Sequence, residues 1–469
     1  MMLVHRLSGG RVSLDDLRDS DTAKAALLAG SMIANNVIAL GSTVVFARLL
    51  PDSNGGGYGS LAALVSYFLI LSVAGQALQV ATAREGVLGH LGVGAGLMAT
   101  VRRWTRAMAL FTVAISVVSV LAREPIAQAV GVPHDQWGAA LGLPAAALWL
   151  ELSILRGMLQ AVGDYRGVGL SLIGEQAARL ITGAALAAAG LGVTGAYLGT
   201  PLSFIAMGGF CAWCLHRYVQ RFEAAASGKP VTQARTAQTV APVVFTLWTH
   251  TKRAWAPIAG LIIIAVLQNI DIIAAKHRFT TSVASSYGAT AVAAKVLIWV
   301  AMGAGFYLVP EVSRRRASGE DTRPILFRAL GIVAVCAVPV LLIFLFGGRP
   351  LLHAAFGADK LKAADSLPVL GLAFAVLACT YLAIQYMLAL KRTWFLPALA
   401  AVAVAEPILL LSAPQEPAGF AAVVLGVQAV GAVVAFAFAL GPDRHPPPAA
   451  PSDPGRVRNE TERVPEPVL

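Results

Sequence analysis

Residues 27–47 read LLAGSMIANNVIALGSTVVFA, a stretch whose only amide or charged side chains are the adjacent Asn35 and Asn36. A helix that crosses a membrane needs about 20 mainly apolar residues, so this stretch predicts a span. The pattern returns 233 positions later in residues 261–275, LIIIAVLQNIDIIAA, where Gln268 and Asn269 replace the two asparagines. An internal repeat of apolar segments is typical of transporters.

Further residue pairs keep the repeat in order along the chain. Tyr58-Gly59 returns 229 positions later as Tyr287-Gly288, and Pro144 returns 224 positions later as Pro368. A change in loop length accounts for the smaller second offset. The sequence therefore predicts two similar sets of spans.

Twelve stretches are long and apolar enough to cross a membrane. They are 24–48, 59–83, 101–122, 138–160, 167–189 and 193–215 in the first set, and 254–275, 283–309, 325–346, 366–390, 393–412 and 419–440 in the second. The chain of 469 residues is 57% hydrophobic and only 13% charged, which is too apolar for a soluble protein of this length. We predict an all-α polytopic membrane protein of two six-helix lobes.

The remaining segments divide the chain further. We expect a cytoplasmic N-terminal arm (1–23), a first lobe (24–215), a basic cytoplasmic linker (216–253), a second lobe (254–440) and a disordered cytoplasmic tail (441–469). Residues 86–100 are rich in glycine and too short to cross comfortably, so an interfacial segment is favoured over a further span. Residues 240–255 are either an interfacial amphipathic helix or an ordinary loop.

Lysine and arginine are distributed unequally between the predicted loops. With a cytoplasmic N-terminus, cytoplasmic segments hold 26 of these residues and the opposite loops hold 7. Such an asymmetry predicts cytoplasmic termini in a multi-pass protein of the cytoplasmic (inner) membrane. The net charge of +11 then reflects topology and attraction to anionic lipids, and a nucleic-acid partner is not expected.

Several short motifs resemble those of a known family. These motifs are GSTVVFARLLPD (41–52), LRGMLQAVGDYR (155–166), GLGVTGA (190–196) and NID (269–271), the last followed by SYG (286–288). The chain resembles the polysaccharide-biosynthesis (Wzx-type oligosaccharide) flippases of the multidrug/oligosaccharidyl-lipid/polysaccharide exporter superfamily over residues 23–440. The motifs are mostly structural, so they indicate the family better than the substrate.

The resemblance implies two six-helix lobes around a central cavity that opens alternately to each membrane face. Its substrate would be a polyprenyl-linked oligosaccharide, flipped for surface polysaccharide export without enzymatic chemistry, with polysaccharide assembly proteins as further candidate partners. A cation-coupled multidrug exporter of the same superfamily is the main alternative, because a fold does not determine a function. A membrane-bound polymerase or glycosyltransferase would need a large outer loop, whereas every predicted outer loop has about 20 residues or fewer.

Charged residues inside spans are candidate functional residues, because an unpaired charge in hydrocarbon is costly. Lys295 lies near the middle of its span, and the repeat places Ser66 at the matching position in the first lobe. It could bind an anionic part of the substrate or balance a nearby acid. Asp271, two residues beyond Gln268 and Asn269, could pair with Lys295, bind a coupling ion or contact sugar hydroxyls.

The first lobe offers further candidates for substrate binding. Asn35 and Asn36 can hydrogen-bond sugar hydroxyls or join neighbouring helices. Arg84 and Arg156 are predicted at the cytoplasmic ends of spans two and four, where they could receive an anionic headgroup or act only as topology signals.

Four acidic residues complete the set of candidates. Glu175 and Arg179 are four positions apart on span five and can neutralise each other within that helix. Glu151 and Glu406 have no basic neighbour in sequence, so either can carry a coupling proton or stay neutral. The ion-coupling candidates are therefore Asp271, Glu151, Glu175 and Glu406.

No cofactor or metal is expected. Cys211 and Cys214 form a CxxC pattern, but it lies in an apolar span without a second cysteine pair. No GxxxxGK[ST] phosphate loop occurs in the sequence, so ATP-driven transport has no support.

Overall fold

The computed structural model describes residues 21–52, 57–227 and 255–441, and these residues fold into helices joined by turns. The predicted N-terminal arm, most of the linker and the predicted tail lie outside the described residues. The first lobe contains α2 (Asp21–Leu49), α3 (Tyr58–Val87), α4 (Ala95–Leu121), α5 (Arg123–Val130), α6 (Gln136–Ala140), α7 (Gly142–Ala161), α8 (Tyr165–Leu186), the short turn η1 (Ala187–Leu191) and α9 (Gly192–Ser227).

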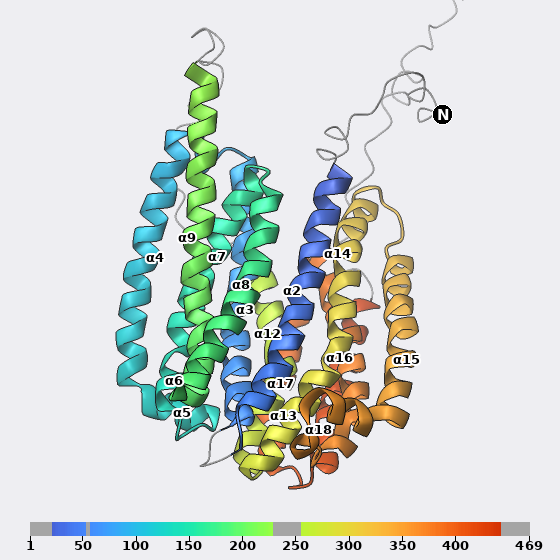
Figure 1. The fold of residues 1–469 in the computed structure, drawn as a ribbon. Coiled ribbons are helices and arrows are strands. Elements are labelled where there is room, and N and C mark those ends of the chain that lie inside the picture. Colours follow the sequence, from blue (N-terminus) through green and yellow to red (C-terminus); the bar gives the residue numbers. More distant parts are fainter. Residues whose placement is uncertain (1–20, 53–56, 228–254, 442–469) are drawn as a thin grey trace, which may run out of the picture.

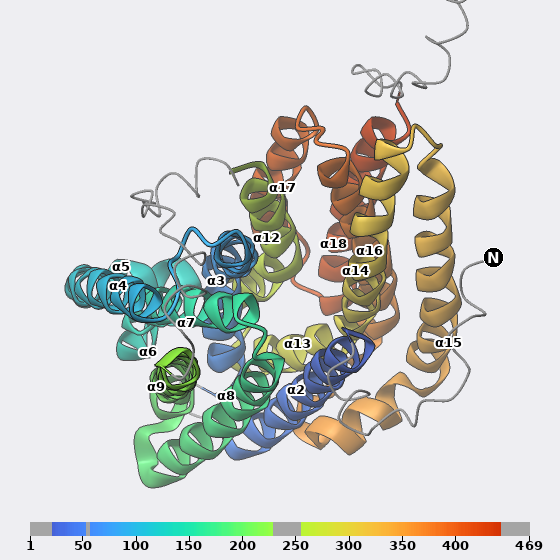
Figure 2. The ribbon, with the colours of Figure 1, turned by 90° about the horizontal axis from the view of Figure 1, so that it is seen from above.

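The second lobe begins with α12 (Trp255–Arg278). It continues with α13 (Thr281–Ala294), α14 (Val296–Ala317), α15 (Arg323–Phe356), the short turns η2 (Ala358–Lys360) and η3 (Ala364–Ser366), α16 (Leu367–Ala389), α17 (Leu396–Ser412) and α18 (Pro417–Ala439). Seen from above in Figure 2, α2 to α9 occupy one side of the molecule and α12 to α18 the other.

The length and apolarity of these helices define a multi-pass membrane protein. Ten helical stretches of the described chain are long and apolar enough to cross a membrane. One of them, Tyr165–Ala224, spans 60 residues and holds two helices, because the chain reverses at η1 and α8 packs beside α9. With α17, which has 17 residues, the described chain contains twelve candidate spans, as the sequence predicts.

The two ends of the helix bundle differ in how the lobes meet. We call the end where α2 passes into α3 the Asp52 end, and the end where α3 passes into α4 the Arg84 end. The Asp52 end lies at the bottom of Figure 1 and carries α5, α6 and the start of α13. The two lobes contact each other where α3 packs against α12 and α13.

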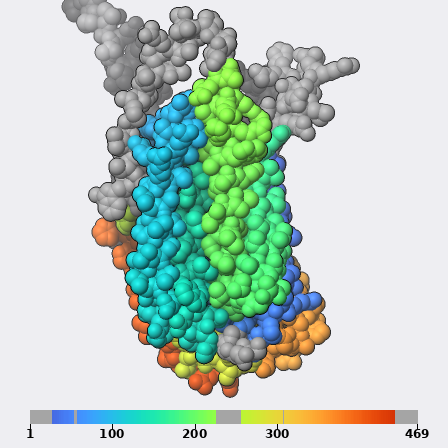
Figure 3. All heavy atoms as spheres, turned by 60° about the vertical axis from the view of Figure 1, so that its left-hand side comes forward, coloured from blue at the N-terminus to red at the C-terminus, as the bar shows by residue number. Residues whose placement is uncertain are grey.

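Several helix boundaries differ from the sequence prediction. Residues 86–100 hold no further span, because α3 continues to Val87, a turn follows, and α4 begins at Ala95. The helix α9 runs twelve residues beyond the predicted end at Leu215, so the start of the predicted linker is helical. Figure 3 shows α4 and α9 side by side on one face, with α9 projecting farther at the Arg84 end. The thickness of the hydrocarbon limits the length of the apolar stretch, whereas a helix can continue beyond the membrane on polar sequence. The helices are therefore longer than the predicted spans.

The predicted eighth span is broken into two helices. The helix α13 ends at Ala294, α14 begins at Val296, and Lys295 lies between them. The backbone N–H of Ile298 donates to the carbonyl of Lys295 at 3.0 Å, a three-residue turn that is tighter than an α-helix. This break fixes the position of the one lysine within the span.

Candidate functional site: buried charges in both lobes

A cluster of polar side chains lies inside the second lobe, and we call it the Asp271 cluster: Asn269, Asp271, Tyr287 and Lys295. The Lys295 Nζ lies 3.4 Å from Asp271 Oδ1 and 3.5 Å from Asn269 Oδ1. The Tyr287 hydroxyl donates to Asp271 Oδ2 at 3.3 Å. The structure therefore pairs Lys295 with Asp271, one of the alternatives that the sequence leaves open.

The surroundings of this pair explain why it is stable in a lobe interior. Asp271 is fully buried and Lys295 is 7% exposed. Two neighbours contribute to charge compensation, since Asp271 accepts from Tyr287 and the Lys295 ammonium lies 5.4 Å from the centre of the Phe374 ring. In this conformation Lys295 is occupied by protein groups and is not presented to a ligand.

Glu406 lies on α17 in a second buried polar site of the same lobe. Gln428 on α18 donates through Nε2 to Glu406 Oε1 at 3.1 Å and to the carbonyl of Leu267 at 2.9 Å. Glu406 is fully buried, and its Oε2 has no hydrogen-bond partner among the described residues. A buried carboxyl group with one unused oxygen can hold a proton without further rearrangement.

In the first lobe, Arg156 on α7 is fully buried and tightly bound to α8. Its Nε donates to Ser171 Oγ, and its Nη2 donates to the carbonyl of Ser171 and to Glu175 Oε2, each at 2.8 Å. The guanidinium also lies 5.5 Å from the centre of the Trp149 ring. Arg156 thus ties two helices together.

This arrangement corrects the prediction for Arg156 and changes the one for Glu175. Arg156 does not reach the membrane face, so a lipid headgroup cannot contact it in this conformation. Glu175 forms its ion pair with Arg156, whereas Arg179, one helical turn away on the same helix, makes no direct ion pair with Glu175 although the two opposite charges still attract each other. The i, i+4 rule considers a single helix, whereas the partner in the structure comes from an adjacent one. Arg179 has no hydrogen bond or ion pair within the described part of the chain.

The remaining predicted residues are not gathered into one site. Asn35 and Asn36 are half-buried on α2, and Asn35 Nδ2 donates to Asn36 Oδ1 at 3.4 Å. Gln268 on α12 is half-buried. Arg84 is exposed in the last turn of α3, at a helix end as predicted.

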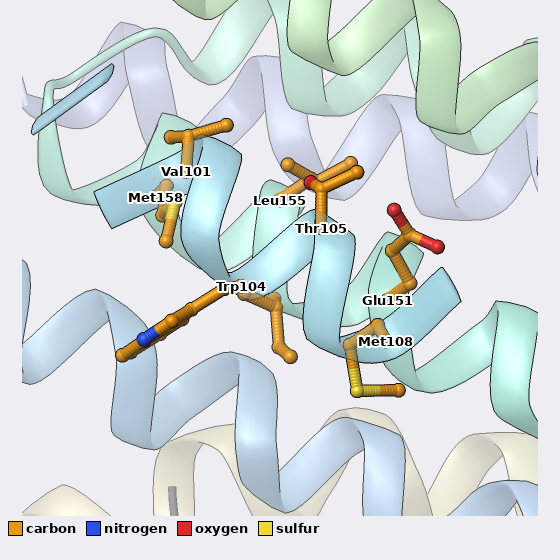
Figure 4. A pocket seen from close by; sticks show the side chains of 8 residues that line it. Val101, Trp104, Thr105, Met108, Glu151, Leu155 and Met158 are labelled. Carbon is orange, nitrogen blue, oxygen red and sulfur yellow. The ribbon is translucent and has the colours of Figure 1, made fainter. Parts of the chain in front are cut away.

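Glu151 lies apart from the other acids, in a crevice between α4 and α7. Figure 4 shows its carboxylate on the side of Thr105 of α4 and pointing away from Met108, with Leu155 and Met158 of α7 farther along the same crevice. The lining is mostly apolar. Glu151 therefore has no basic partner in this crevice.

Sequence reasoning missed a polar junction between the lobes at the Asp52 end. Lys360, between α15 and α16, is fully buried, and its Nζ lies 2.6 Å from Asp52 Oδ2 in the loop after α2. A second carboxylate, Asp359, lies 3.0 Å from the same Nζ but is largely exposed. The sequence feature that could have predicted this junction is an acid directly after the first span, at Pro51-Asp52, together with a second-lobe loop on the same predicted side that carries lysines.

The helix α13 takes part in this junction through two serines. Ser285 Oγ donates to Asp52 Oδ1 at 2.5 Å and accepts from the backbone N–H of Gly59 at 2.8 Å. Ser286 Oγ donates to the carbonyl of Lys360 at 2.6 Å and accepts from the N–H of Ala363 at 2.8 Å. We call Asp52, Ser285, Ser286 and Lys360 the Asp52 latch.

Other polar contacts between the lobes surround the Asp52 latch. Lys276 Nζ donates to Ser60 Oγ at 3.2 Å, and Arg48 Nε donates to the carbonyl of Ala355 at 3.2 Å. Asp135 lies in the loop before α6, and burial raises the pKa of its carboxyl group although Ser60 and Lys276 act in the opposite direction. The described polar contacts between lobes thus lie at one end of the bundle.

No protein-family model matches the chain, and no curated protein sequence matches it either. Solved structures do match over nearly its whole length. An inward-facing conformation of a multidrug resistance MATE family transporter of the MOP superfamily has a TM-score of 0.65 at 13% identity, covering 87% of this chain and 94% of that one. The lipid II flippase MurJ in an inward closed conformation gives 0.62 at 14% identity, covering 88% and 87%.

A eukaryotic MATE transporter, AtDTX14, gives a TM-score of 0.61 at 14% identity and covers 90% of this chain and 96% of that one. Both kinds of transporter therefore share the architecture described above. The chain has the fold of the MATE and MurJ transporters of the MOP superfamily. At these identities the likeness establishes the fold and leaves the substrate to be argued from the residues.

Proposed function

We propose that the protein is a transporter, not an enzyme, that flips a polyprenyl-linked oligosaccharide across the cytoplasmic membrane for surface polysaccharide export. The observation that carries this proposal is the polar character of α2, whose apolar span Gly30–Leu49 holds Asn35 and Asn36 but no carboxylate. Neutral amide side chains can hydrogen-bond sugar hydroxyls, whereas a site for a cationic drug would be expected to contain a carboxylate. The shared fold with the lipid II flippase MurJ is consistent with a lipid-linked substrate.

Alternating access would follow from opening and closing the two bundle ends. With both termini in the cytoplasm, the Asp52 end faces outward, and the Asp52 latch closes the protein to the outside. The Arg84 end then faces the cytoplasm, where exposed Arg84 meets anionic lipid or an anionic substrate headgroup. Polysaccharide assembly proteins would receive the flipped product on the outer side.

The buried acids of the second lobe are the proposed ion-coupling residues. Glu406 has an unused carboxyl oxygen, and Asp271 is bound by a lysine that competes with any incoming cation. We propose that Glu406 takes the coupling proton and that Asp271 and Lys295 respond to it. Within this scheme, Lys295 contacts substrate only after its pair with Asp271 opens, with Gln268 and Asn269 beside it.

The candidates in the first lobe then have different roles. Glu175 neutralises Arg156 and holds α8 to α7, so both act chiefly in positioning helices. Glu151 remains a secondary proton-coupling candidate in its peripheral crevice.

A cation-coupled multidrug exporter is the second candidate. The favouring observation is the pair of buried carboxylates, Asp271 and Glu406, in a fold shared with a multidrug resistance transporter. The two candidates make opposite predictions for cells that lack the protein.

Deletion of the gene tests the proposal. We expect loss of a surface glycan together with accumulation of its lipid-linked precursor in the inner leaflet, both restored by the full chain. Normal glycan with increased drug sensitivity would reject the flippase and support the exporter. The precursor should be measured by extraction and mass spectrometry, because its accumulation separates a transport defect from a synthesis defect.

A further inference from the structure

The lysine of the second lobe fills a position whose surrounding groups are those that bind a free cation. Lys295 Nζ lies 3.4 Å from Asp271 Oδ1 and 3.5 Å from Asn269 Oδ1. It also lies 5.4 Å from the centre of the Phe374 ring. Oxygen ligands suit hard cations such as Na⁺ and K⁺, and an aromatic face attracts any cation. The same three groups could therefore hold an inorganic monovalent cation in place of the ammonium.

Hydrogen bonds to other groups orient the two oxygens toward this position. Asn269 Nδ2 donates to the carbonyl of Ala265 on its own helix at 2.9 Å, which leaves Asn269 Oδ1 toward the lysine. The Tyr287 hydroxyl donates to Asp271 Oδ2 at 3.3 Å, which leaves Asp271 Oδ1 for the ammonium. Both side chains are buried. The two oxygens should thus keep their positions when the lysine is removed.

The internal repeat shows that the acid and the lysine occur together. The offset of 233 between the lobes places Ile38 opposite Asp271. The offset of 229 places Ser66 opposite Lys295, so the first lobe folds with neither charge at these positions. A buried ion pair often stabilises a fold less than apolar side chains in the same place. Its presence in one lobe only favours a role beyond stability for a carboxylate that needs a cation beside it.

We propose that the Lys295 ammonium takes the place of an inorganic cation in a monovalent-cation site formed by Asp271, Asn269 and Phe374. The protein then carries its own cation in the second lobe, and Na⁺ and K⁺ find the site occupied. Transport should therefore need neither ion, a consequence that rests on the proposed function, whereas the occupancy of the site does not depend on the substrate.

Removal of the lysine tests the site in the purified full-length protein. Lys295→Ala leaves Asp271 buried without its cation, so the midpoint of thermal unfolding should fall. Propylammonium supplies the three carbons and the ammonium that alanine lacks, and K⁺ supplies the charge alone. Each should raise the midpoint by at least about 2 °C, because a ligand that binds only the folded state stabilises it. The bulky N-methylglucamine cation at equal ionic strength gives the baseline.

Two controls isolate the charge of the site. The wild type should show no such rise, since its own ammonium fills the position. The double variant Lys295→Ala with Asp271→Asn keeps the space but has no carboxylate, and it should be equally insensitive. A folded Lys295→Ala protein that responds to neither cation would overturn the proposal. A wild type that K⁺ stabilises as strongly as it stabilises Lys295→Ala would overturn it as well.

Lys295→Met keeps the test decisive if Lys295→Ala folds poorly. The methionine side chain fills the space of the lysine stem and leaves only the position of the ammonium. K⁺ should therefore stabilise this variant, whereas propylammonium should not. If K⁺ fails to stabilise Lys295→Met, the proposal is overturned.

Transport by the wild type separates this site from the proposed function. Flipping of a lipid-linked sugar in vesicles without Na⁺ and K⁺ would support both. If flipping requires either ion, the flippase assignment stands and the proposed role of Lys295 fails. If Lys295→Ala gains the response to K⁺ but deletion of the gene leaves the surface glycan normal, the cation site stands and the flippase assignment fails.

Discussion

Replacing Asp52 by asparagine should open the Asp52 end of the protein. The substitution keeps the shape of the side chain but removes the charge that lies 2.6 Å from the buried Lys360 ammonium. The hydrogen bond from Ser285 Oγ can persist to the amide oxygen. The change therefore isolates the ion pair from the rest of the Asp52 latch.

The size of the effect follows from the burial of this pair. Removing one partner of a buried ion pair typically costs about 3–5 kcal/mol, because the other charge stays buried. Asp359 remains 3.0 Å from Lys360, so we expect the lower end of this range. If the pair forms only when the lobes are closed at this end, about 3 kcal/mol shifts the closed-to-open ratio about 100-fold.

Cysteine labelling measures this shift. Ala62 on α3 lies in the interface between the lobes, where it faces Gly288 of α13, and it is buried. In a chain with its four native cysteines replaced by alanine, Ala62→Cys should react slowly with a membrane-impermeant maleimide added outside the cell. Adding Asp52→Asn should accelerate that reaction by one to two orders of magnitude.

Asp359→Asn is the matched control, because it removes the same charge from the exposed partner of the same lysine. It should change the labelling rate less than about twofold, as expected for an exposed pair. Equal labelling rates in the parent, Asp52→Asn and Asp359→Asn proteins would refute the role of the Asp52 latch in closing this end.

Three further predictions concern the second lobe and the orientation. Asp271→Asn alone should lower the yield of folded protein by leaving Lys295 buried without its partner, whereas Lys295→Met combined with it should restore folding. A stable but inactive double variant would indicate a transport role for the pair, and wild-type transport would indicate a structural one. Glu406→Gln should fold normally yet transport at a rate that no longer responds to a pH gradient; a persisting response would exclude Glu406 as the coupling site. A single cysteine at Ser53 should be labelled by a reagent added outside the cell, and a single cysteine at Ser452 should be protected from it. Labelling of both would overturn the proposed topology.

The number of spans could be predicted from the sequence because the membrane imposes it. An apolar run of about 20 residues is stable in few places outside a bilayer, so all twelve stretches reappear as helices or helix pairs. Helix ends could not be predicted in the same way, since α9 and α15 continue beyond the apolar run on polar or glycine-containing sequence. The break at Lys295 also had no sequence signal, because neither proline nor glycine occurs beside it.

Most charged residues inside the spans were foreseen, but only one of their pairings was. Asp271 was a candidate partner for Lys295 because the two charges lie in consecutive predicted spans. Arg156 was assigned to the membrane face by its distance from the end of a span, yet packing of α7 against α8 places it inside the lobe beside Glu175. Lys360 counted only as a loop cation, since its burial depends on a contact between the two lobes.

The helix α13 should have only two well-populated positions, because three consecutive residues, Ser285, Ser286 and Tyr287, anchor it. All three are fully buried, and their side chains make five hydrogen bonds that end on Asp52, on backbone groups of both lobes, and on Asp271. Each such bond contributes about 1 kcal/mol, and any shift of the helix along its axis strains them together. A half-displaced α13 would lose these bonds before new ones form, so intermediate positions should be scarcely populated. The proposed transport cycle should then proceed as discrete switches between two positions of this helix, with rates set by a cooperative barrier rather than by gradual sliding.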